Sequence, residues 1–474
     1  MPFLVSSRTT LWMNGLLERV FQRLHLQRIS KPQLKACSAC KEQTSTTRTI
    51  MTNPYLVYCT PAGEIREEVR LRALAFGNQP LAAAHLIPLP DGVTLSMMPD
   101  RLAVGEKPSG ERQVMARSRG WAAAALLPIG YTRTHLPAYE KVPGTEPLPF
   151  FGYSAVAGMH GRLYVAAIQT DDPRKWHPRA FARRALERLV SEKRAAYPHN
   201  RIVEQHAHCA LDYSCPTASN LFFGRWEMAI AVSPGCNARC VGCISKQEEE
   251  DLISPQDRLT FIPTVNEIVE VAVPHLEQAE DALVSFGQGC EGEPLLQYRR
   301  IEQAIKAMRE RTDKGVININ TNASNPRWLQ RLYDAGLDTI RASTISGHPQ
   351  TYTAYYRPIG YSFEDVKASL RRARDAGVYS SINLLCFPGM IDREREVEAL
   401  LAFIKETGVR LIQLRNLNID PEVLLPRMPA LDSMGKALGM RDMIEILKRE
   451  VPEVELGNFT RPVKRTKAVA ATGR

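Results

Sequence analysis

The sequence has no apolar segment long enough to cross a membrane. Its longest apolar run lies near 121–127, whereas a spanning helix needs about 20 apolar residues. The first residues also lack the compact apolar core and small-residue cleavage site of a secretory signal. We therefore expect a cytoplasmic protein that does not bind a membrane.

A disulfide framework is also not expected, although the chain has ten cysteines. Disulfides do not persist in a reducing compartment, and a chain of 474 residues can bury a core without cross-links. The cysteines are clustered, which favours metal ligation. The apolar and charged fractions, 44% and 24%, are those of an ordinary globular protein. The length predicts two or three structural units.

The net charge of +10 is concentrated in part at the two ends of the chain. Residues 1–50 hold eight basic and two acidic side chains, and Arg461 begins a basic tail. Basic ends can contact nucleic acid, but they are more often solvated arms. We predict that 1–50 is a basic extension with too few apolar residues for a core, and Met51 is an alternative start. Its Cys37-Ser-Ala-Cys40 is at best half of a metal site.

The most informative feature is a group of three thiols, Cys236, Cys240 and Cys243, at a CxxxCxxC spacing. They directly follow the apolar run Trp226–Val232. Thiolates are soft ligands that hold iron–sulfur clusters or zinc. Three thiolates bind three irons of a [4Fe–4S] cube and leave the fourth iron open to a substrate or cofactor. The alternative is a structural zinc knuckle completed by a distant His or Cys.

Two further regions lie between the basic extension and this motif. Residues 51–200 are predicted to form an N-terminal α+β domain, with a hairpin over 150–156 and 163–168 and a basic helix over 178–197. Residues 201–225 form a connector rich in Cys and His. Two interpretations stay open there: Cys209 and Cys215 ligate a second metal centre, or they are buried thiols. The connector also holds His206 and His208.

Strands and helices alternate from 226 to 425. Glycines at 336, 377 and 408 each stand between a helical run and a β run, as a left-handed helix cap requires. Repeated helix–Gly–strand units predict a parallel sheet closed into a partial (βα)6 barrel, whose chemistry lies at the C-terminal strand ends. Residues 426–474 are expected to be a C-terminal helix, near 431–449, and a basic tail. The predicted strands are Trp226–Val232, Ala282–Phe286, Val316–Thr321, Asp338–Ser343, Val378–Leu385 and Val409–Arg415.

The cysteine motif and the later segment Gly289–Pro294 together resemble the radical S-adenosylmethionine (SAM) superfamily. The segment is similar to the family's GGEP-type motif, which binds the amino group of the SAM methionine. The resemblance implies that Gly292, Glu293 and Pro294 bind SAM, because glycine admits close approach and Glu293 can accept from an ammonium. It also implies ligand contacts for strand residues near the barrel mouth, with Asn416 near the adenine. These residues are Asn318, Asn320, Thr321, Asn322, Arg341, Ser343 and Asn383, of which we select Ser343 and Asn383 as SAM contacts.

Three further positions deserve separate expectations. The family often has an aromatic residue before the third cluster cysteine, packed on the adenine, and here that residue is Gly242. Cys290 and Cys386 fall at predicted C-terminal strand ends. Each could donate a hydrogen atom or ligate a second cluster, while the simpler interpretation is a buried thiol.

The resemblance implies an enzyme that uses a [4Fe–4S] cluster to cleave SAM reductively and abstract hydrogen from a substrate. The expected partners are a low-potential electron donor, such as a flavodoxin or ferredoxin, and a small-molecule or peptide substrate that the sequence does not identify. A second Fe–S cluster is a further cofactor hypothesis. The alternative function is a zinc- or cluster-stabilised protein that binds nucleic acid without radical chemistry.

Overall fold

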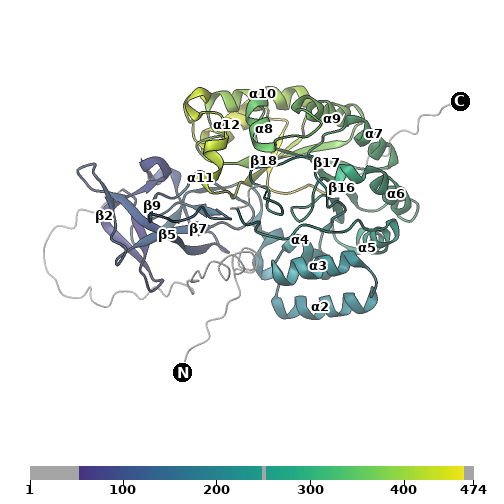
Figure 1. The fold of residues 1–474 in the computed structure, drawn as a ribbon, viewed down its shortest axis with the longest axis horizontal. Coiled ribbons are helices and arrows are strands. Elements are labelled where there is room, and N and C mark those ends of the chain that lie inside the picture. The colour runs from purple at the N-terminus through teal and green to yellow at the C-terminus, as the bar shows by residue number, and fades with distance from the viewer. Residues whose placement is uncertain (1–52, 248–251, 464–474) are drawn as a thin grey trace.

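The computed structural model describes residues 53–247 and 252–463, which form an N-terminal β-rich unit and a larger α/β unit (Figure 1). The extension 1–50, its two cysteines and most of the basic tail lie outside the described residues. Within the described ranges, no helix combines the length and apolar character needed to cross a membrane.

The N-terminal unit is built on an antiparallel sheet, with strands in the order β10-β7-β5-β2-β1-β11-β12-β4. The predicted hairpin is confirmed at β11 and β12, which pair Gly158 with Leu163. The pairing of the two strands ends near Ala155, whose N–H donates to the His135 carbonyl. The first predicted strand is therefore divided into β10 and β11, and the second into β12 and β13. The strands are β1 (Tyr55–Cys59), β2 (Ile65–Ala75), β3 (Gln79–Pro80), β4 (Ile87–Pro88), β5 (Thr94–Glu106), β6 (Arg112–Val114), β7 (Trp121–Leu126), β8 (Tyr131–Arg133), β9 (Tyr139–Lys141), β10 (Tyr153–Ser154), β11 (Val156–Met159), β12 (Arg162–Val165) and β13 (Ala167–Gln169).

The predicted connector 201–225 is helical and packs on the α/β unit. The helices α2 (Arg183–Ala196), α3 (Arg201–Asp212) and α4 (Pro216–Phe223) stack beside α5 (Val265–Gln278) at the lower edge of Figure 1. Asn200 starts α3 by accepting from two backbone N–H groups, and Gly224 ends α4 in the left-handed conformation. The Cys and His residues of the connector therefore occupy fixed positions on helices.

The α/β unit contains a seven-stranded parallel sheet in the order β14-β15-β16-β17-β18-β19-β20. The six predicted strands and the parallel barrel-type architecture are confirmed. The prediction for the C-terminal region was incomplete, because a seventh strand of three residues, with no apolar run of its own, pairs with β19. The strands are β14 (Glu227–Ile230), β15 (Leu283–Phe286), β16 (Val316–Thr321), β17 (Thr339–Thr344), β18 (Tyr379–Cys386), β19 (Leu411–Asn416) and β20 (Glu455–Gly457).

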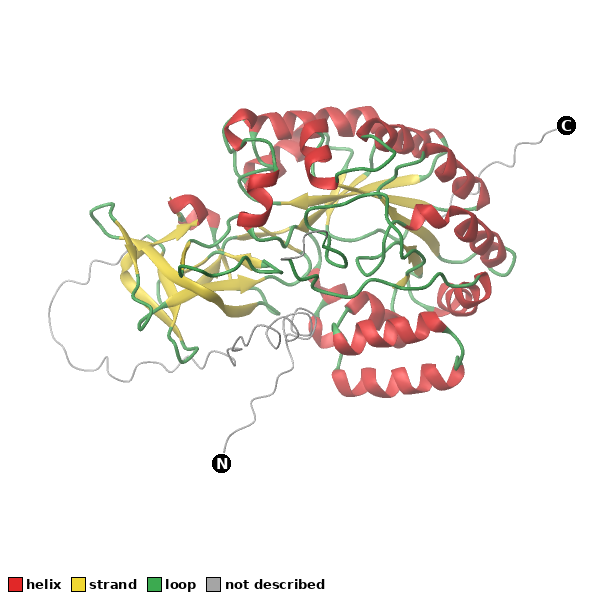
Figure 2. Ribbon diagram, viewed as in Figure 1, coloured by secondary structure: helices red, strands yellow, loops and turns green. Residues whose placement is uncertain are grey.

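Helices cover the outer face of this sheet (Figure 2). The Thr264–Glu267 capping box starts α5 as predicted, and Gly336 and Gly408 end α7 and α10 at positive φ. The single helix expected near 431–449 is a 3-10 turn, Leu431–Met434, followed by α12, because Gly435 and Gly439 interrupt it. The helices are α5 (Val265–Gln278), α6 (Tyr298–Arg309), α7 (Pro326–Ala335), α8 (Pro349–Tyr356), α9 (Phe363–Asp375), α10 (Glu394–Thr407), α11 (Pro421–Leu424) and α12 (Met440–Glu450).

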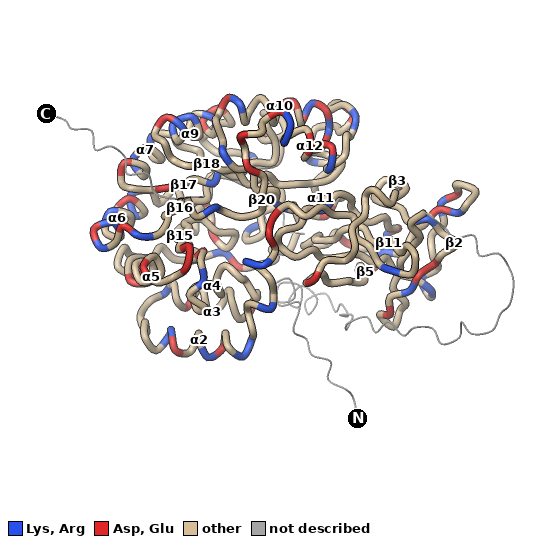
Figure 3. Tube along the Cα trace, turned by 180° about the vertical axis from the view of Figure 1, so that it is seen from behind, with Lys and Arg blue, Asp and Glu red and all other residues tan. Residues whose placement is uncertain are grey.

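Charges of both signs alternate along the outer helices (Figure 3). On α2, for example, opposite charges neutralise each other in two i,i+4 ion pairs, Arg183–Glu187 and Arg188–Glu192. Arg461, the first residue of the predicted basic tail, binds Asp171 at 2.9 Å. The remaining basic ends, on which the nucleic-acid hypothesis rests, lie outside the described residues.

Two fully buried arginines join the β-rich unit to the C-terminal end of β19. Arg101 Nη2 donates to Asp420 Oδ2 at 3.0 Å, and neither side chain is exposed to solvent. Arg133 donates to the carbonyls of Phe151 and Leu417. These contacts are charge-assisted and shielded from water, so they hold the β-rich unit against the barrel.

We predict that Arg101→Met lowers the free energy of unfolding by about 3–5 kcal/mol, because it leaves the Asp420 carboxylate buried without its cation. Denaturant unfolding followed by circular dichroism measures the change. The matched control, Arg188→Met, breaks a pair that is more than half exposed and should cost less than about 1 kcal/mol. Equal effects of the two changes would contradict the role of the buried pair.

Candidate functional site

The three motif cysteines lie in the loop that follows β14, at the C-terminal end of the parallel sheet. The loop is fixed by backbone hydrogen bonds to the end of α8. Arg239 N–H donates to Tyr356 O at 3.0 Å, and Val241 N–H donates to Tyr355 O at 2.9 Å. Because α8 follows β17, the loop spans the mouth of the sheet.

The three thiols lie close enough to influence one another. Burial raises the pKa of Cys236 to about 11, and the charges of Glu293 and Cys243 add to the effect. The pKa of Cys240 is raised well above its usual range by burial and by the two other thiols. A bound cation would favour the ionised form of Cys236 and Cys240, because a metal ion lowers the pKa of a thiol that it binds.

The cluster and the zinc alternatives differ in how the thiolates are shared. Within the described ranges, no three His, Cys, Asp or Glu side chains are grouped so that they could share one metal ion. A cube does not require such a group, because each thiolate binds a different iron. Metal analysis of the purified protein distinguishes the two alternatives.

Arg258 contacts the third thiol, which the sequence gave no reason to expect. Its Nη2 lies 3.2 Å from Cys243 Sγ, and its Nε donates to Ser245 Oγ at 3.1 Å. Its charge also lowers the pKa of Cys236. A cation beside ligating sulfurs stabilises the more negative, reduced form of a cluster.

The Gly289–Pro294 segment is bound directly to the cysteine loop. Gly292 N–H donates to Ser233 O at 2.7 Å, and Glu293 N–H donates to Gly235 O at 2.8 Å. A Cβ at Gly292 would lie only 1.9 Å from Gly235 O. Glycine is therefore required at 292 because the two loops pack backbone to backbone.

Glu291 reinforces this contact and was not selected from the sequence. Its buried carboxylate accepts from the N–H groups of Val232, Ser233 and Gln288, at 2.7, 2.8 and 2.8 Å. Burial raises its pKa to about 8, against the lowering effect of these three donors. Glu291 thus fixes the point where β14 turns into the cysteine loop.

Glu293 is buried, and most of its carboxylate is used within the protein. It accepts from Leu295 N–H at 2.9 Å, from Asn322 N–H at 2.7 Å and from the Thr321 hydroxyl. Burial raises its pKa to about 7. A carboxylate has about four acceptor positions, so one position is left for a ligand, and the role of Glu293 in SAM binding stays a prediction.

Ser343 and Asn383 are neighbours in register on β17 and β18, and both are half-buried. Asn383 Oδ1 is buried with no hydrogen-bond partner in the described structure. An unsatisfied acceptor of this kind is costly unless a ligand binds it. The pair therefore fits a polar ligand at the barrel mouth, as expected for SAM.

Other polar strand residues bind protein groups. Arg341 donates to Gln413 at 3.1 Å and to Thr460 at 2.8 Å. Both ends of the Asn416 amide bind β8, through Arg133 N–H at 2.9 Å and the Tyr131 carbonyl at 3.0 Å. Asn416 thus joins the two units, and its predicted place near the adenine stays untested. The amides of Asn318, Asn320 and Asn322 and the hydroxyl of Thr321 also form hydrogen bonds to protein groups.

The glycine at 242 has a structural explanation. A Cβ there would lie 2.6 Å from the Tyr355 hydroxyl oxygen, so the buried Tyr355 leaves no room for a larger side chain. Tyr355 lies within electrostatic range of Cys240 and Cys243. An aromatic ring thus lies beside the cysteine loop, but it comes from α8.

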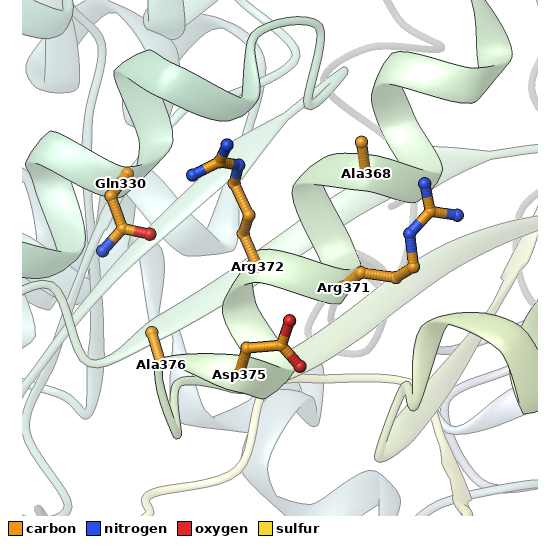
Figure 4. A pocket seen from close by; sticks show the side chains of 6 residues that line it. All are labelled: Gln330, Ala368, Arg371, Arg372, Asp375 and Ala376. Atoms are coloured by element: carbon orange, nitrogen blue, oxygen red, sulfur yellow. The ribbon is translucent and has the colours of Figure 1, made fainter.

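A surface pocket lined by Gln330, Ala368, Arg371, Arg372, Asp375 and Ala376 is a poor candidate site (Figure 4). It lies on α7 and at the C-terminal end of α9, which leads into the N-terminal end of β18. Chemistry in parallel α/β folds occurs at the opposite edge. Arg371 is moreover paired with Glu364 and Glu406.

Comparison with known proteins agrees with the site. Residues 230–402 match the family model of the Radical SAM superfamily. The chain is 29% identical over 193 residues to a GTP 3',8-cyclase of Trichormus variabilis, covering 39% of this chain and 55% of that protein. It is 22% identical over 195 residues to a probable GTP 3',8-cyclase of Methanococcus maripaludis, covering 41% and 60%. The chain thus spans little more than half the length of these relatives.

Among solved structures, methylornithine synthase aligns with a TM-score of 0.36 at 14% identity, over 58% of this chain and 71% of that one. The family match confirms, over residues 230–402, the resemblance drawn from the sequence motifs.

We predict that Gly292→Ala abolishes SAM binding and lowers the iron content of the anaerobically reconstituted protein, because the added methyl group forces the two loops apart. Iron analysis and equilibrium dialysis with SAM measure both effects. Gly360→Ala is the matched control: it adds the same methyl group at a left-handed φ of 74°, which strains the backbone locally, but a Cβ there meets nothing within 4 Å, so SAM affinity and iron content should be kept. Normal SAM affinity in Gly292→Ala would contradict the packing argument.

We predict that Arg258→Gln lowers the reduction potential of the bound cluster by roughly 50 mV, equivalent to about 1 kcal/mol, because a positive charge near a sulfur ligand is lost. A redox titration monitored by electron paramagnetic resonance measures the shift. Arg299→Gln, which removes an exposed charge on α6, should leave the potential unchanged. A shift of equal size in both variants would contradict a specific role for Arg258.

Proposed function

We propose that this protein is a radical SAM enzyme, whose substrate the sequence and structure do not identify. One observation carries the proposal: a CxxxCxxC loop at the mouth of a parallel barrel is bound, backbone to backbone, to the Gly289–Pro294 segment. The first provides ligands for an iron–sulfur cluster, and the second resembles the segment that binds SAM. Their direct contact is what a SAM molecule bound to an open iron requires.

Cys236, Cys240 and Cys243 would hold the [4Fe–4S] cluster. Gly292, Glu293, Pro294, Ser343 and Asn383 are proposed to bind SAM, and the unsatisfied Asn383 Oδ1 supports this assignment. When bound, the cluster and SAM supply a reductively generated 5′-deoxyadenosyl radical that abstracts hydrogen from substrate.

The protein itself shields the cysteine loop from water. Tyr352, Tyr355 and Tyr356 of α8 are buried, and this burial raises the pKa of all three, with a further contribution from the charge of Cys240. Their rings exclude water from the side of the loop that faces α8. Exclusion of water protects reactive intermediates from side reactions.

We propose that the β-rich unit contributes to substrate binding. Its strand β8 contacts the C-terminal end of β19 through Asn416 and through Arg133, which donates to the Leu417 carbonyl. This edge of the sheet is the one that carries the cysteine loop. We therefore assign to 53–169 the shaping of a substrate site over the barrel mouth.

The substrate class stays open. The cyclases that the chain resembles act on GTP by name, but the identity is 22–29%, and the similarity covers at most 60% of their length. The reaction needs one low-potential electron per SAM cleaved, so an external donor such as a flavodoxin or ferredoxin is a proposed partner. A small molecule or a peptide is the proposed substrate.

The central prediction is that the reconstituted protein releases 5′-deoxyadenosine from SAM with a strong reductant under anaerobic conditions, slowly even without substrate. Cys236→Ala, Cys240→Ala and Cys243→Ala should each abolish this product, because a cube with two protein ligands is poorly held. Liquid chromatography of the nucleosides measures it.

Cys59→Ala is the control, because this thiol is buried in the sheet of the β-rich unit and should leave SAM cleavage intact. A wild-type protein that binds both a cluster and SAM but never releases 5′-deoxyadenosine would overturn the proposed function.

A further inference from the structure

A second group of three thiols lies outside the CxxxCxxC loop. It comprises Cys209 on α3, Cys215 at the start of α4, and Cys290 in the loop after β15. The thiols of Cys209 and Cys290 are hydrogen-bonded, and Cys215 lies within electrostatic range of them: burial and then Cys209 raise the pKa of Cys215, and Cys215 adds to the effects of the hydrogen bond and of burial that raise the pKa of Cys290. The sequence suggested the first two as a pair and Cys290 separately as a candidate ligand of a second cluster, but only the fold brings the three together.

Separate contacts hold each of the three backbones in place. Cys215 N–H donates to Cys209 O at 3.0 Å, and Leu259 N–H donates to Cys290 O at 2.7 Å. Asp257, two residues before Leu259, is hydrogen-bonded to the hydroxyl of Tyr213. Tyr213 lies between Cys209 and Cys215 in the sequence. The convergence of the thiols is therefore built into three packed segments.

Ordinary roles for buried thiols do not account for this group. All three are free thiols, and Cys215 and Cys290 are only half-buried. Cys386, by comparison, is fully buried and donates to the carbonyl of Leu384 on its own strand. Gln205 Nε2 lies 3.3 Å from Cys209 Sγ, a donor contact of the kind that tunes cluster sulfurs.

We propose that Cys209, Cys215 and Cys290 bind a second iron–sulfur cluster, a [4Fe–4S] cube held by three thiolates. Thiolates are soft ligands that select iron–sulfur clusters, zinc or cuprous copper. Three thiolates would leave one iron of such a cube without a protein ligand, as at the first site. Iron and sulfide analysis distinguishes a cube from a single zinc ion.

The second cluster would be a neighbour of the first. Three consecutive residues connect the two groups: Asp257 is bound to Tyr213, Arg258 lies 3.2 Å from Cys243 Sγ, and Leu259 binds Cys290 O. Cys290 also directly precedes Glu291, which fixes the start of the CxxxCxxC loop. A cofactor at the second group therefore lies on the same face of the barrel as the proposed SAM site.

The test uses the full chain with Cys236, Cys240 and Cys243 all changed to Ala, reconstituted anaerobically with iron and sulfide. We expect about four irons and four sulfides per chain, against about eight of each in the wild type. Adding Cys209→Ser, Cys215→Ser and Cys290→Ser should remove the remaining iron. Adding Cys59→Ser and Cys386→Ser instead should leave it in place.

A second measurement does not depend on changing the buried Cys209. In the triple Ala variant, Cys215 and Cys290 should resist alkylation while iron is bound and react after chelation, with an unchanged circular dichroism spectrum. The reduced variant should also show the electron paramagnetic resonance signal of a cluster.

Three results would overturn the proposal: no iron in the folded triple Ala variant, zinc in place of iron, or a Cys209–Cys290 disulfide found by mass spectrometry. None of them would affect SAM cleavage by the wild type, so failure of the second cluster is distinguishable from failure of the proposed function.

Discussion

The rest of the site depends on the backbone contact between the cysteine loop and the Gly289–Pro294 segment. Gly292 and Glu293 each donate one N–H to a carbonyl of the loop, at 2.7 and 2.8 Å. The absence of a side chain at Gly292 permits this, since a Cβ would overlap Gly235 O. The two loops, which follow neighbouring strands, thereby form one rigid surface. A cofactor that binds there does not pay the entropy cost of ordering them.

Electrostatics explains why such a surface suits a cationic cofactor. Burial raises the pKa of Glu291 to about 8 and that of Glu293 to about 7, and it raises the pKa of Cys236 and Cys240 as well. Burial and mutual repulsion disfavour the ionised forms of neighbouring acidic groups, unless a positive charge lies beside them. Iron ions and the sulfonium and ammonium of SAM supply such charge, and Arg258 supplies some in their absence.

The two flanking regions are connected to this centre by buried polar contacts. Arg101 and Arg133 join the β-rich unit to the end of β19, while α3 and α4 bring two more thiols beside Cys290. Buried charged contacts specify one arrangement, since a shifted interface would leave them unpaired. The barrel mouth is therefore bordered on both sides by elements that precede the barrel in sequence.

Local signals in the sequence were sufficient for the barrel and its cysteine loop. Alternating apolar runs and helix-ending glycines such as Gly336 and Gly408 act within a few residues, so six strands, their helices and the ligand spacing of the CxxxCxxC motif followed from the chain alone. The seventh strand did not, because its three residues are held by pairing with β19 and have no apolar run of their own.

Tertiary structure decided what depends on contacts between distant residues. Only the fold shows that Arg258 reaches Cys243, that Glu291 holds the start of the loop, and that Cys290 meets Cys209. It also explains Gly242, whose side-chain space is filled by Tyr355 from a helix more than a hundred residues later. A helix cap or a ligand spacing is a pattern of nearby residues and can be recognised in the sequence. A contact between side chains from distant segments has no such local pattern.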